Sequence, residues 1–210
     1  MNKLTIFLLL SLLFGNRSYG QKIFSEGVIK YEVFVNGSEK PDGMYIVTVK
    51  NNLSRRELVM NNGFNNILIS NQKTGTSISL NVDAENKYAL TMTPAEVAEK
   101  NKRFEKTVFT FSEQKKKLAG YASSAATVRY LNGEEATFYF TGDLLPPHES
   151  FNTMFPGLQG VPLEYEVKSN AATTIRFVAT ALETKSVDLK VFDIPKDYKI
   201  VSKEELEKIK

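Results

Sequence analysis

The sequence contains no cysteine and no tryptophan, and it contains a single histidine, His148. Without cysteine, the chain has no disulfide bonds, thiolate metal ligands, cysteine nucleophile or lipid anchor on cysteine. A single histidine also excludes metal sites and proton relays that depend on several imidazoles. Any chemistry of this chain must therefore come from carboxylates, hydroxyls, cations or the shape of its apolar surfaces.

The chain also lacks a strong excess of one charge. Its 210 residues include 27 Lys and Arg against 24 Asp and Glu, for a formal net charge of +3. A nucleic-acid-binding protein usually shows a clustered excess of basic residues, so the sequence predicts no nucleic-acid partner. Hydrophobic residues make up 42% and charged residues 24% of the chain, which is typical of a globular protein. The length favours one domain.

The N-terminus has the order of segments that is typical of a secretory signal peptide. A short basic start precedes the apolar run Leu4–Phe14, and Ser18-Tyr19-Gly20 supplies small residues for cleavage. The apolar run is shorter than the about 17–25 residues that a membrane-spanning helix needs. A buried N-terminal helix is the alternative. We therefore predict a signal peptide at residues 1–20 and a single β-rich domain at residues 21–210. The protein should be exported, to the periplasm, the outer membrane surface or the medium, without a membrane span.

Alternation of apolar and polar residues predicts β-strands along most of the remaining chain. In Gly27–Val35, for example, alternation places four side chains on one face: Ile29, Tyr31, Val33 and Val35. Turns such as Asn132-Gly133 separate neighbouring strands and leave no room for crossover helices, so the pairing should be antiparallel. The predicted strands are Gly27–Val35, Met44–Lys50, Leu53–Met60, Phe64–Ser70, Thr76–Val82, Lys87–Thr91, Thr107–Phe111, Ala126–Leu131, Glu135–Thr141, Pro162–Lys168, Thr173–Leu182 and Val187–Phe192.

Two capping boxes predict short helices. Thr93-Pro94-Ala95-Glu96 opens a helix with few large apolar side chains, which should lie at the rim of the sheet. Ser202-Lys203-Glu204-Glu205 opens a second one near the C-terminus, and His148–Met154 is a third candidate. A single antiparallel sheet of about ten to twelve strands should curl, close or split into two packed sheets. The sequence thus predicts a mainly β fold: a curved antiparallel sheet or incomplete barrel with two or three short helices.

Several short motifs occur in the order seen in a known family. They are Gly27-Val28-Ile29-Lys30-Tyr31, Leu118-Ala119-Gly120-Tyr121, Phe155–Pro162 and Phe192–Tyr198. This order resembles the exported Bacteroidetes proteins called domain of unknown function 4412, and Phe155–Pro162 is similar to the GLPGLI family. These families resemble the lipoprotein carriers LolA and LolB, which implies a curved, incomplete barrel with helices over an apolar concavity. Members often carry a cysteine shortly after the Gly-Tyr pair, where this chain has Ala122-Ser123-Ser124. The resemblance implies no catalytic residue.

His148 is the natural starting point in a search for a catalytic or metal site. With Glu149 and Ser150 it supplies the residue types of a serine hydrolase, but adjacent residues do not define triad geometry and no nucleophile-elbow motif is present. We expect an exposed loop or helix-cap histidine, and a hydrolase is the alternative. Asp143, His148 and Glu149 offer too few ligands on one loop for a metal. The sequence therefore predicts no catalytic, cofactor-binding or metal-binding residues and a protein that is not an enzyme.

Basic runs and aromatic residues are the remaining candidates for binding. Lys100–Lys106 and Lys115–Lys117 would favour anionic surfaces such as lipid headgroups, although a solvated face is the usual role of such runs. The 14 Phe and nine Tyr residues, concentrated in the strands, would line an apolar pocket together with Met44, Met60 and Met92. Ordinary core packing is the alternative for these aromatic residues.

Two classes of function follow from these features. The first is an exported envelope protein that binds a lipid or other apolar small molecule in the concave face of a curved sheet. The second is a scaffold or interaction module of the envelope, with a filled core and a protein partner on the sheet edge or outer face. An open apolar cavity would favour the first function, and a solid core would favour the second.

Overall fold

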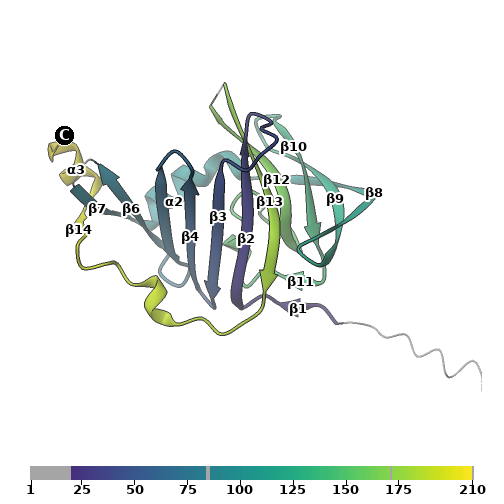
Figure 1. The fold of residues 1–210 in the computed structure, drawn as a ribbon, viewed down its shortest axis with the longest axis horizontal. Coiled ribbons are helices and arrows are strands. Elements are labelled where there is room, and N and C mark those ends of the chain that lie inside the picture. The colour runs from purple at the N-terminus through teal and green to yellow at the C-terminus, as the bar shows by residue number, and fades with distance from the viewer. Residues whose placement is uncertain (1–19, 84–85, 171, 210) are drawn as a thin grey trace, which may run out of the picture.

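Strands account for most of the fold. The structure, a computed structural model, describes residues 20–83, 86–170 and 172–209. The strands of the main sheet are β2 (Glu26–Val35), β3 (Gly43–Lys50), β4 (Leu53–Met60), β5 (Asn65–Asn71), β6 (Thr76–Asp83), β7 (Asn86–Met92), β8 (Val108–Leu118), β9 (Tyr121–Arg129), β10 (Glu135–Thr141), β12 (Val161–Asn170), β13 (Thr173–Glu183) and β14 (Lys199–Val201). Across the described ranges, they form one 12-stranded sheet in the order β14-β7-β6-β5-β4-β3-β2-β13-β12-β10-β9-β8 (Figure 1).

This sheet confirms the predicted fold class. It is mainly β, curved and antiparallel, and it is open because its edge strands β14 and β8 do not pair with each other (Figure 1). Two short pairings are parallel instead: β14 with β7, and β1 (Lys22–Ile23) with β11 (Leu144–Leu145). The helical elements are α2 (Pro94–Asn101), α3 (Lys203–Ile209) and the 3-10 turns η1 (Lys102–Phe104), η2 (Glu149–Phe151) and η3 (Leu189–Phe192).

Both predicted capping boxes form. The Thr93 hydroxyl accepts a hydrogen bond from the Glu96 amide at 3.3 Å, and the Glu96 carboxylate accepts one from the Thr93 amide at 2.7 Å. Ser202 and Glu205 make the same reciprocal pair at the start of α3. None of the residues of α2 is buried, and the helix lies behind the strands in the view of Figure 1. It therefore covers the sheet only in part, as its few large apolar residues predict.

Alternation along the strands gives the sheet two different faces. Ile29, Tyr31 and Val33 of β2 are buried on the face that α2 covers in part, which we call the concave face. On β4, Arg56 points to the concave face and Arg55 to the opposite, convex face, because successive side chains of a strand alternate. The predicted face of Gly27–Val35 is thus confirmed.

The segment between β11 and β12 covers the part of the concave face that β9, β10 and β12 form. Phe155 of this segment packs on Phe138 of β10, with ring centroids 4.3 Å apart. Asn152 holds the segment in place, because its Nδ2 donates to the carbonyl oxygens of Leu158 and Gly160 at 3.4 and 2.9 Å. Phe155–Pro162 therefore has a structural role in this chain.

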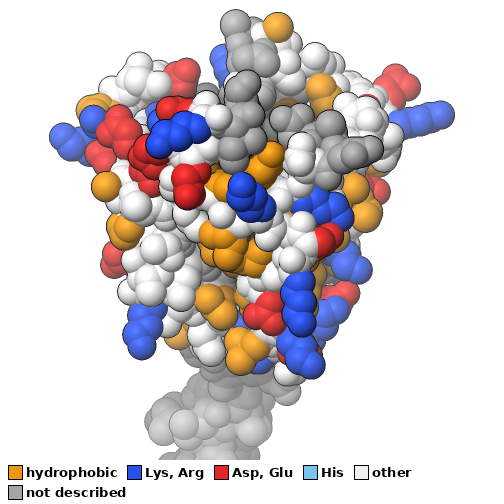
Figure 2. Space-filling model, turned by 90° about the vertical axis from the view of Figure 1, so that its left-hand side faces the viewer, with side chains coloured by type: hydrophobic (Ala, Val, Ile, Leu, Met, Phe, Trp, Pro, Cys, Tyr) orange, Lys and Arg blue, Asp and Glu red, His pale blue; other side chains and the backbone are white. Residues whose placement is uncertain are grey.

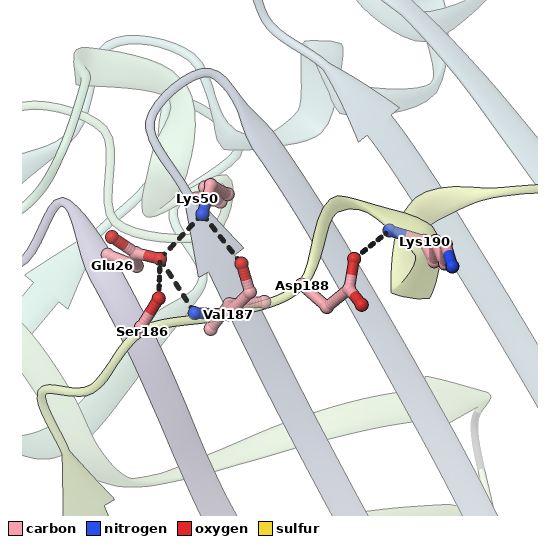
Figure 3. Close-up of polar contacts among 6 residues, drawn as sticks. All are labelled: Glu26, Lys50, Ser186, Val187, Asp188 and Lys190. Atoms are coloured by element: carbon pink, nitrogen blue, oxygen red, sulfur yellow. Dashed lines mark hydrogen bonds and ion pairs between the residues drawn. The ribbon is translucent and has the colours of Figure 1, made fainter.

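The segment that follows β13 crosses the convex face of the other half of the sheet. Val187 and Phe192 pack there with Ile67 and Ile69 of β5. Figure 3 shows its attachment to β2 and β3: a Glu26 carboxylate oxygen accepts hydrogen bonds from Lys50 Nζ at 2.7 Å and from the Val187 amide at 2.6 Å. Lys50 Nζ also donates to the Val187 carbonyl at 2.6 Å. We call this group of contacts the Glu26 clasp.

The strand prediction differs from the structure in several places. The predicted strand Val187–Phe192 contains the 3-10 turn η3, because the Asp188 carboxylate accepts from the Lys190 amide at 2.9 Å and caps a turn there. β8 continues to Leu118 and β9 begins at Tyr121, although the lysine-rich sequence between the two predicted strands does not alternate. β14 was not predicted. The predicted signal peptide at residues 1–20 lies almost entirely outside the described residues.

The Glu26 clasp should make stability depend on pH. Hydrogen bonds from Lys50 and Val187 lower the pKa of Glu26 below its ordinary 4.5. The folded state therefore gains stability from ionised Glu26 above pH 4.5, and it loses this gain as the pH falls through the lower folded pKa. We expect Glu26→Gln to lower the melting temperature at pH 7, and the difference from wild type to shrink below pH 4.5.

Thermal unfolding followed by circular dichroism measures this effect. Glu39→Gln is the matched control, because it removes the same charge from an exposed residue that makes no hydrogen bond or ion pair within the described chain. Equal melting temperatures of the two variants at pH 7 would contradict the prediction.

Candidate functional site

A cavity of about 210 Å³ opens on the concave face. Its floor comes from β2, β3 and β12, which contribute Tyr31, Tyr45 and Tyr165. Leu68 of β5 and Val97 of α2 also line it. The cavity is therefore framed by the sheet on one side and by α2 and the segment after β11 on the other.

The three tyrosines form a continuous aromatic floor. The ring centroid of Tyr31 lies 5.7 Å from that of Tyr45 and 5.9 Å from that of Tyr165, and Phe177 stacks on Tyr165 at 5.0 Å. The Tyr31 hydroxyl donates to the Pro162 carbonyl at 2.9 Å. Burial raises the pKa of all three tyrosines, so their hydroxyls are neutral donors at physiological pH.

Arg56 brings a positive charge to this aromatic surface. Its Nη1 donates to the Ser54 hydroxyl at 2.8 Å, and its Nη2 donates to the Phe151 carbonyl at 2.7 Å. The guanidinium also lies over the Phe151 ring, 5.7 Å from its centroid. The positive charge of Arg56 lowers the pKa of the Tyr45 hydroxyl, but burial raises this pKa by more. Arg56 thus links the sheet to the covering segment and faces the cavity.

The methionines that the sequence singled out lie in different places. Met92 lines the cavity, as predicted. Met60 packs at the margin of the main core cluster. Met44 is 52% exposed, so its assignment to a pocket was wrong. Its neighbour Tyr45 points into the cavity, and alternation along β3 therefore turns Met44 to the convex face.

Two further hollows adjoin the covering segment. One, of about 460 Å³, is lined by charged residues of both signs, Arg103, Glu134, Glu135, Glu166 and Lys168, together with apolar side chains. The other, of about 500 Å³, shares Asn152 and Thr153 with the aromatic cavity. Figure 2 shows the end of the molecule that bears β6, β7, β14 and α3, where acidic and basic side chains are interspersed around hydrophobic ones. The charged side chains at this end of the molecule are therefore of both signs.

His148 lies outside the cavity, at the N-cap of η2, and is half-buried. Its Nδ1 is 3.1 Å from the Ser150 hydroxyl, which also donates to the Gln72 side-chain carbonyl. Its Nε2 is buried and has no hydrogen-bond partner within the described residues. In a serine hydrolase the second imidazole nitrogen bonds to a carboxylate, and His148 has no such partner within the described residues. The predicted cap position is confirmed, and the predicted exposure was wrong because Phe151 covers the ring.

The other predicted sites lie on separate surfaces. Asp143 is exposed, and within the described residues no group of three His, Cys, Asp or Glu side chains is arranged to hold a metal ion. Lys116, from the second basic run, forms an ion pair with Glu164 and lies over the Tyr139 ring, 3.7 Å from its centroid. Lys100, from the first run, lines the cavity. The two basic runs therefore do not join into one patch.

Comparisons with known proteins identify the fold. No family model and no curated protein matches the sequence. A structure of PNGF-II has a TM-score of 0.50 at 15% identity and is matched over 88% of this chain. The match spans 33% of the PNGF-II chain, so this chain corresponds to about a third of that protein.

Two other solved structures match with lower TM-scores. The complex of MucA and MucB from Pseudomonas aeruginosa has a TM-score of 0.47 at 12% identity, over 84% of this chain and 58% of that one. A LolA superfamily protein from Nitrosomonas europaea has a TM-score of 0.35 at 6% identity, over 83% of this chain and 92% of that one.

The sequence analysis missed Arg56, Tyr45 and Leu68 as a group. All three lie in strands whose alternation was predicted, so their common face could have been found by aligning the strands in register. The covering residues Phe151 and Asn152 gave no such signal, because only the folded segment after β11 brings them over the sheet.

The environment of His148 leads to a prediction about its titration. Burial, aided by the nearby Arg56 charge, lowers the pKa of His148 below its ordinary 6.5. The chain has one histidine, so its Hε1 resonance in the untagged protein is assigned without ambiguity. We expect an NMR titration midpoint below 6.5.

The same shift affects stability. As the pH falls below about 6.5 the unfolded chain binds a proton more readily than the folded one, so the free energy of unfolding should fall until the folded pKa is reached. His148→Asn should reduce this dependence. A midpoint at or above 6.5 would show that the imidazole is better solvated than the structure indicates.

Proposed function

We propose that this chain is an exported, non-enzymatic envelope protein that binds an apolar small molecule, such as a lipid fragment, in the concave cavity. The observation that supports this proposal is the cavity of about 210 Å³ between the sheet and α2, with its lining of tyrosine, aliphatic and methionine side chains. Binding sites for small molecules are concave and mostly apolar, with few polar groups. The sequence pattern of a signal peptide and the resemblance to domain of unknown function 4412 support export.

The size of the cavity limits the ligand. At roughly 30 Å³ for each water molecule, the cavity corresponds to about seven waters. A ligand or ligand segment of about eight non-hydrogen atoms would therefore fill it, and a complete membrane lipid would extend beyond it. Each CH₂ group moved from water into the cavity contributes about 0.8 kcal/mol. A medium-length alkyl chain is thus sufficient for measurable binding.

A protein partner on the sheet edge is the second candidate function. β8 pairs only with β9, so one side of its backbone is free within the described chain. Val108 and Phe111 on this strand are 54% and 62% exposed. Free strand edges pair with extended segments of other chains. The Phe155 side chain fills part of the concave face, which favours a partner outside the cavity.

Among the helices of the described residues, none has the length and apolar character that a membrane span requires.

Filling the cavity should abolish ligand binding. Leu68→Trp adds an indole to the cavity wall, whereas Leu131→Trp places the same change on a side chain that is 68% exposed. We expect wild type and Leu131→Trp to bind 1-octanol equally. Leu68→Trp should bind it at least about tenfold more weakly, which equals the loss of roughly two buried CH₂ groups.

Isothermal titration calorimetry measures these affinities, and native mass spectrometry of gently purified protein shows whether a ligand is carried along. Circular dichroism confirms that each variant is folded. If wild type neither binds 1-octanol nor retains any small molecule, the proposed function is wrong and the β8 edge becomes the leading candidate.

A further inference from the structure

The charges that line the cavity all have one sign. Arg56 reaches it from β4 and Lys100 from α2, and no acidic residue lines it within the described chain. The chain as a whole has nearly equal numbers of acidic and basic residues. The excess of positive charge at the cavity is therefore a local feature of the fold and not a result of composition.

Arg56 has no carboxylate partner within the described residues, although it is half-buried. Its guanidinium donates to the Ser54 hydroxyl and to the Phe151 carbonyl, and both of these oxygens are neutral. Arg55, the next residue along β4, pairs with Glu57 at 3.0 Å on the convex face. The two neighbouring arginines thus differ: one is neutralised by the protein, and the other keeps its charge facing an apolar cavity.

The cavity also offers hydrogen-bond donors without matching acceptors. A guanidinium has five N–H donors, and the Arg56 contacts with Ser54 and Phe151 use two of its nitrogens. The Tyr165 hydroxyl lines the same cavity and makes no hydrogen bond within the described residues. Burying a cation without a counter-ion is costly. An anion bound beside Arg56 would remove this cost.

We propose that the cavity binds a medium-chain carboxylic acid whose carboxylate pairs with the Arg56 guanidinium while its alkyl chain lies on the tyrosine floor. This inference rests on the proposed function and adds the chemical class of the headgroup. Arginine and carboxylate form paired, charge-assisted hydrogen bonds because their planar geometries match. Lys100 is exposed at the rim, where it would attract the anion from solution.

A carboxylate fits this site better than a phosphate. Its single charge equals the charge of the one half-buried cation, Arg56, whereas a phosphate monoester carries about two charges and would leave the second in an aromatic surround. The Arg56 charge also acts on His148, whose pKa it lowers together with burial.

The test compares ligands of one chain length with different headgroups. Isothermal titration calorimetry at constant ionic strength uses octanoate, 1-octanol and octyl phosphate with wild type, Arg56→Met, Arg56→Lys and Arg55→Met. Arg55→Met is the matched control, because it removes the same charge from the adjacent residue on the opposite face. We expect octanoate to bind wild type about 10- to 100-fold more tightly than 1-octanol, the range of a charge-assisted hydrogen bond.

The variants separate the inference from the proposed function. Arg56→Met should weaken octanoate binding at least about tenfold more than it weakens 1-octanol binding. Arg56→Lys should keep part of the preference for octanoate, and Arg55→Met should keep all of it. Equal binding of octanoate and 1-octanol to wild type, or tighter binding of octyl phosphate, would overturn the carboxylate assignment and leave the apolar site intact. The wild-type comparison decides this even if Arg56→Met does not fold. Absence of binding of all three ligands would overturn the proposed function as well.

Discussion

The antiparallel pairing of β2 with β13 holds the two halves of the sheet together. We call this pair of strands the seam. Strands β2 to β7 follow one another on one side of it, and the strands from β13 to β8 in the order of the sheet lie on the other. Ala179 of β13 lies opposite Tyr31 of β2. Its small side chain lets Tyr31 meet Tyr165 of β12 across β13, with ring centroids 5.9 Å apart. The seam thus determines both the continuity of the sheet and the aromatic floor of the cavity.

Electrostatics distinguishes the two faces of the sheet. On the convex side, cations such as Lys50 and Arg55 have carboxylate partners at 2.7 and 3.0 Å. On the concave side, Arg56 donates only to neutral oxygens within the described chain. Ion pairs near the surface contribute little to stability, and a half-buried cation without one is costly. An anionic ligand in the cavity would offset the cost of leaving Arg56 without a carboxylate partner.

Local patterns predicted most of the strands and both capped helices. The Asn132-Gly133 turn, for instance, joins β9 to β10 with Gly133 at a φ of +83°, a conformation that glycine adopts without strain. Elements that depend on distant partners were not predictable in this way. β14 is three residues long and exists because β7 provides a backbone to pair with. β8 alternates poorly because both of its faces are largely exposed, so no buried face selects apolar residues.

The site was less predictable than the fold for the same reason. The alternation of β4 places Arg56 on the inner face, but its lack of a partner depends on what the segment after β11 brings over it. Composition singled out His148 and the methionines. The residues that make the cavity aromatic and positively charged lie in strands instead, and composition does not distinguish them from other strand residues. A sequence shows which face a side chain occupies, and only the assembled fold shows what it faces.

The position of β13 in the chain has a consequence for how this protein acquires its fold. Val35 of β2 pairs with Ile175, near the other end of the chain. Strands β2 to β7 can form as successive hairpins, but β2 then presents an unpaired edge until β13 is in place. Contacts between distant parts of a chain form slowly, and exposed strand edges pair with wrong partners. The β2 edge is therefore open to wrong pairing until the last long strand of the sheet has formed.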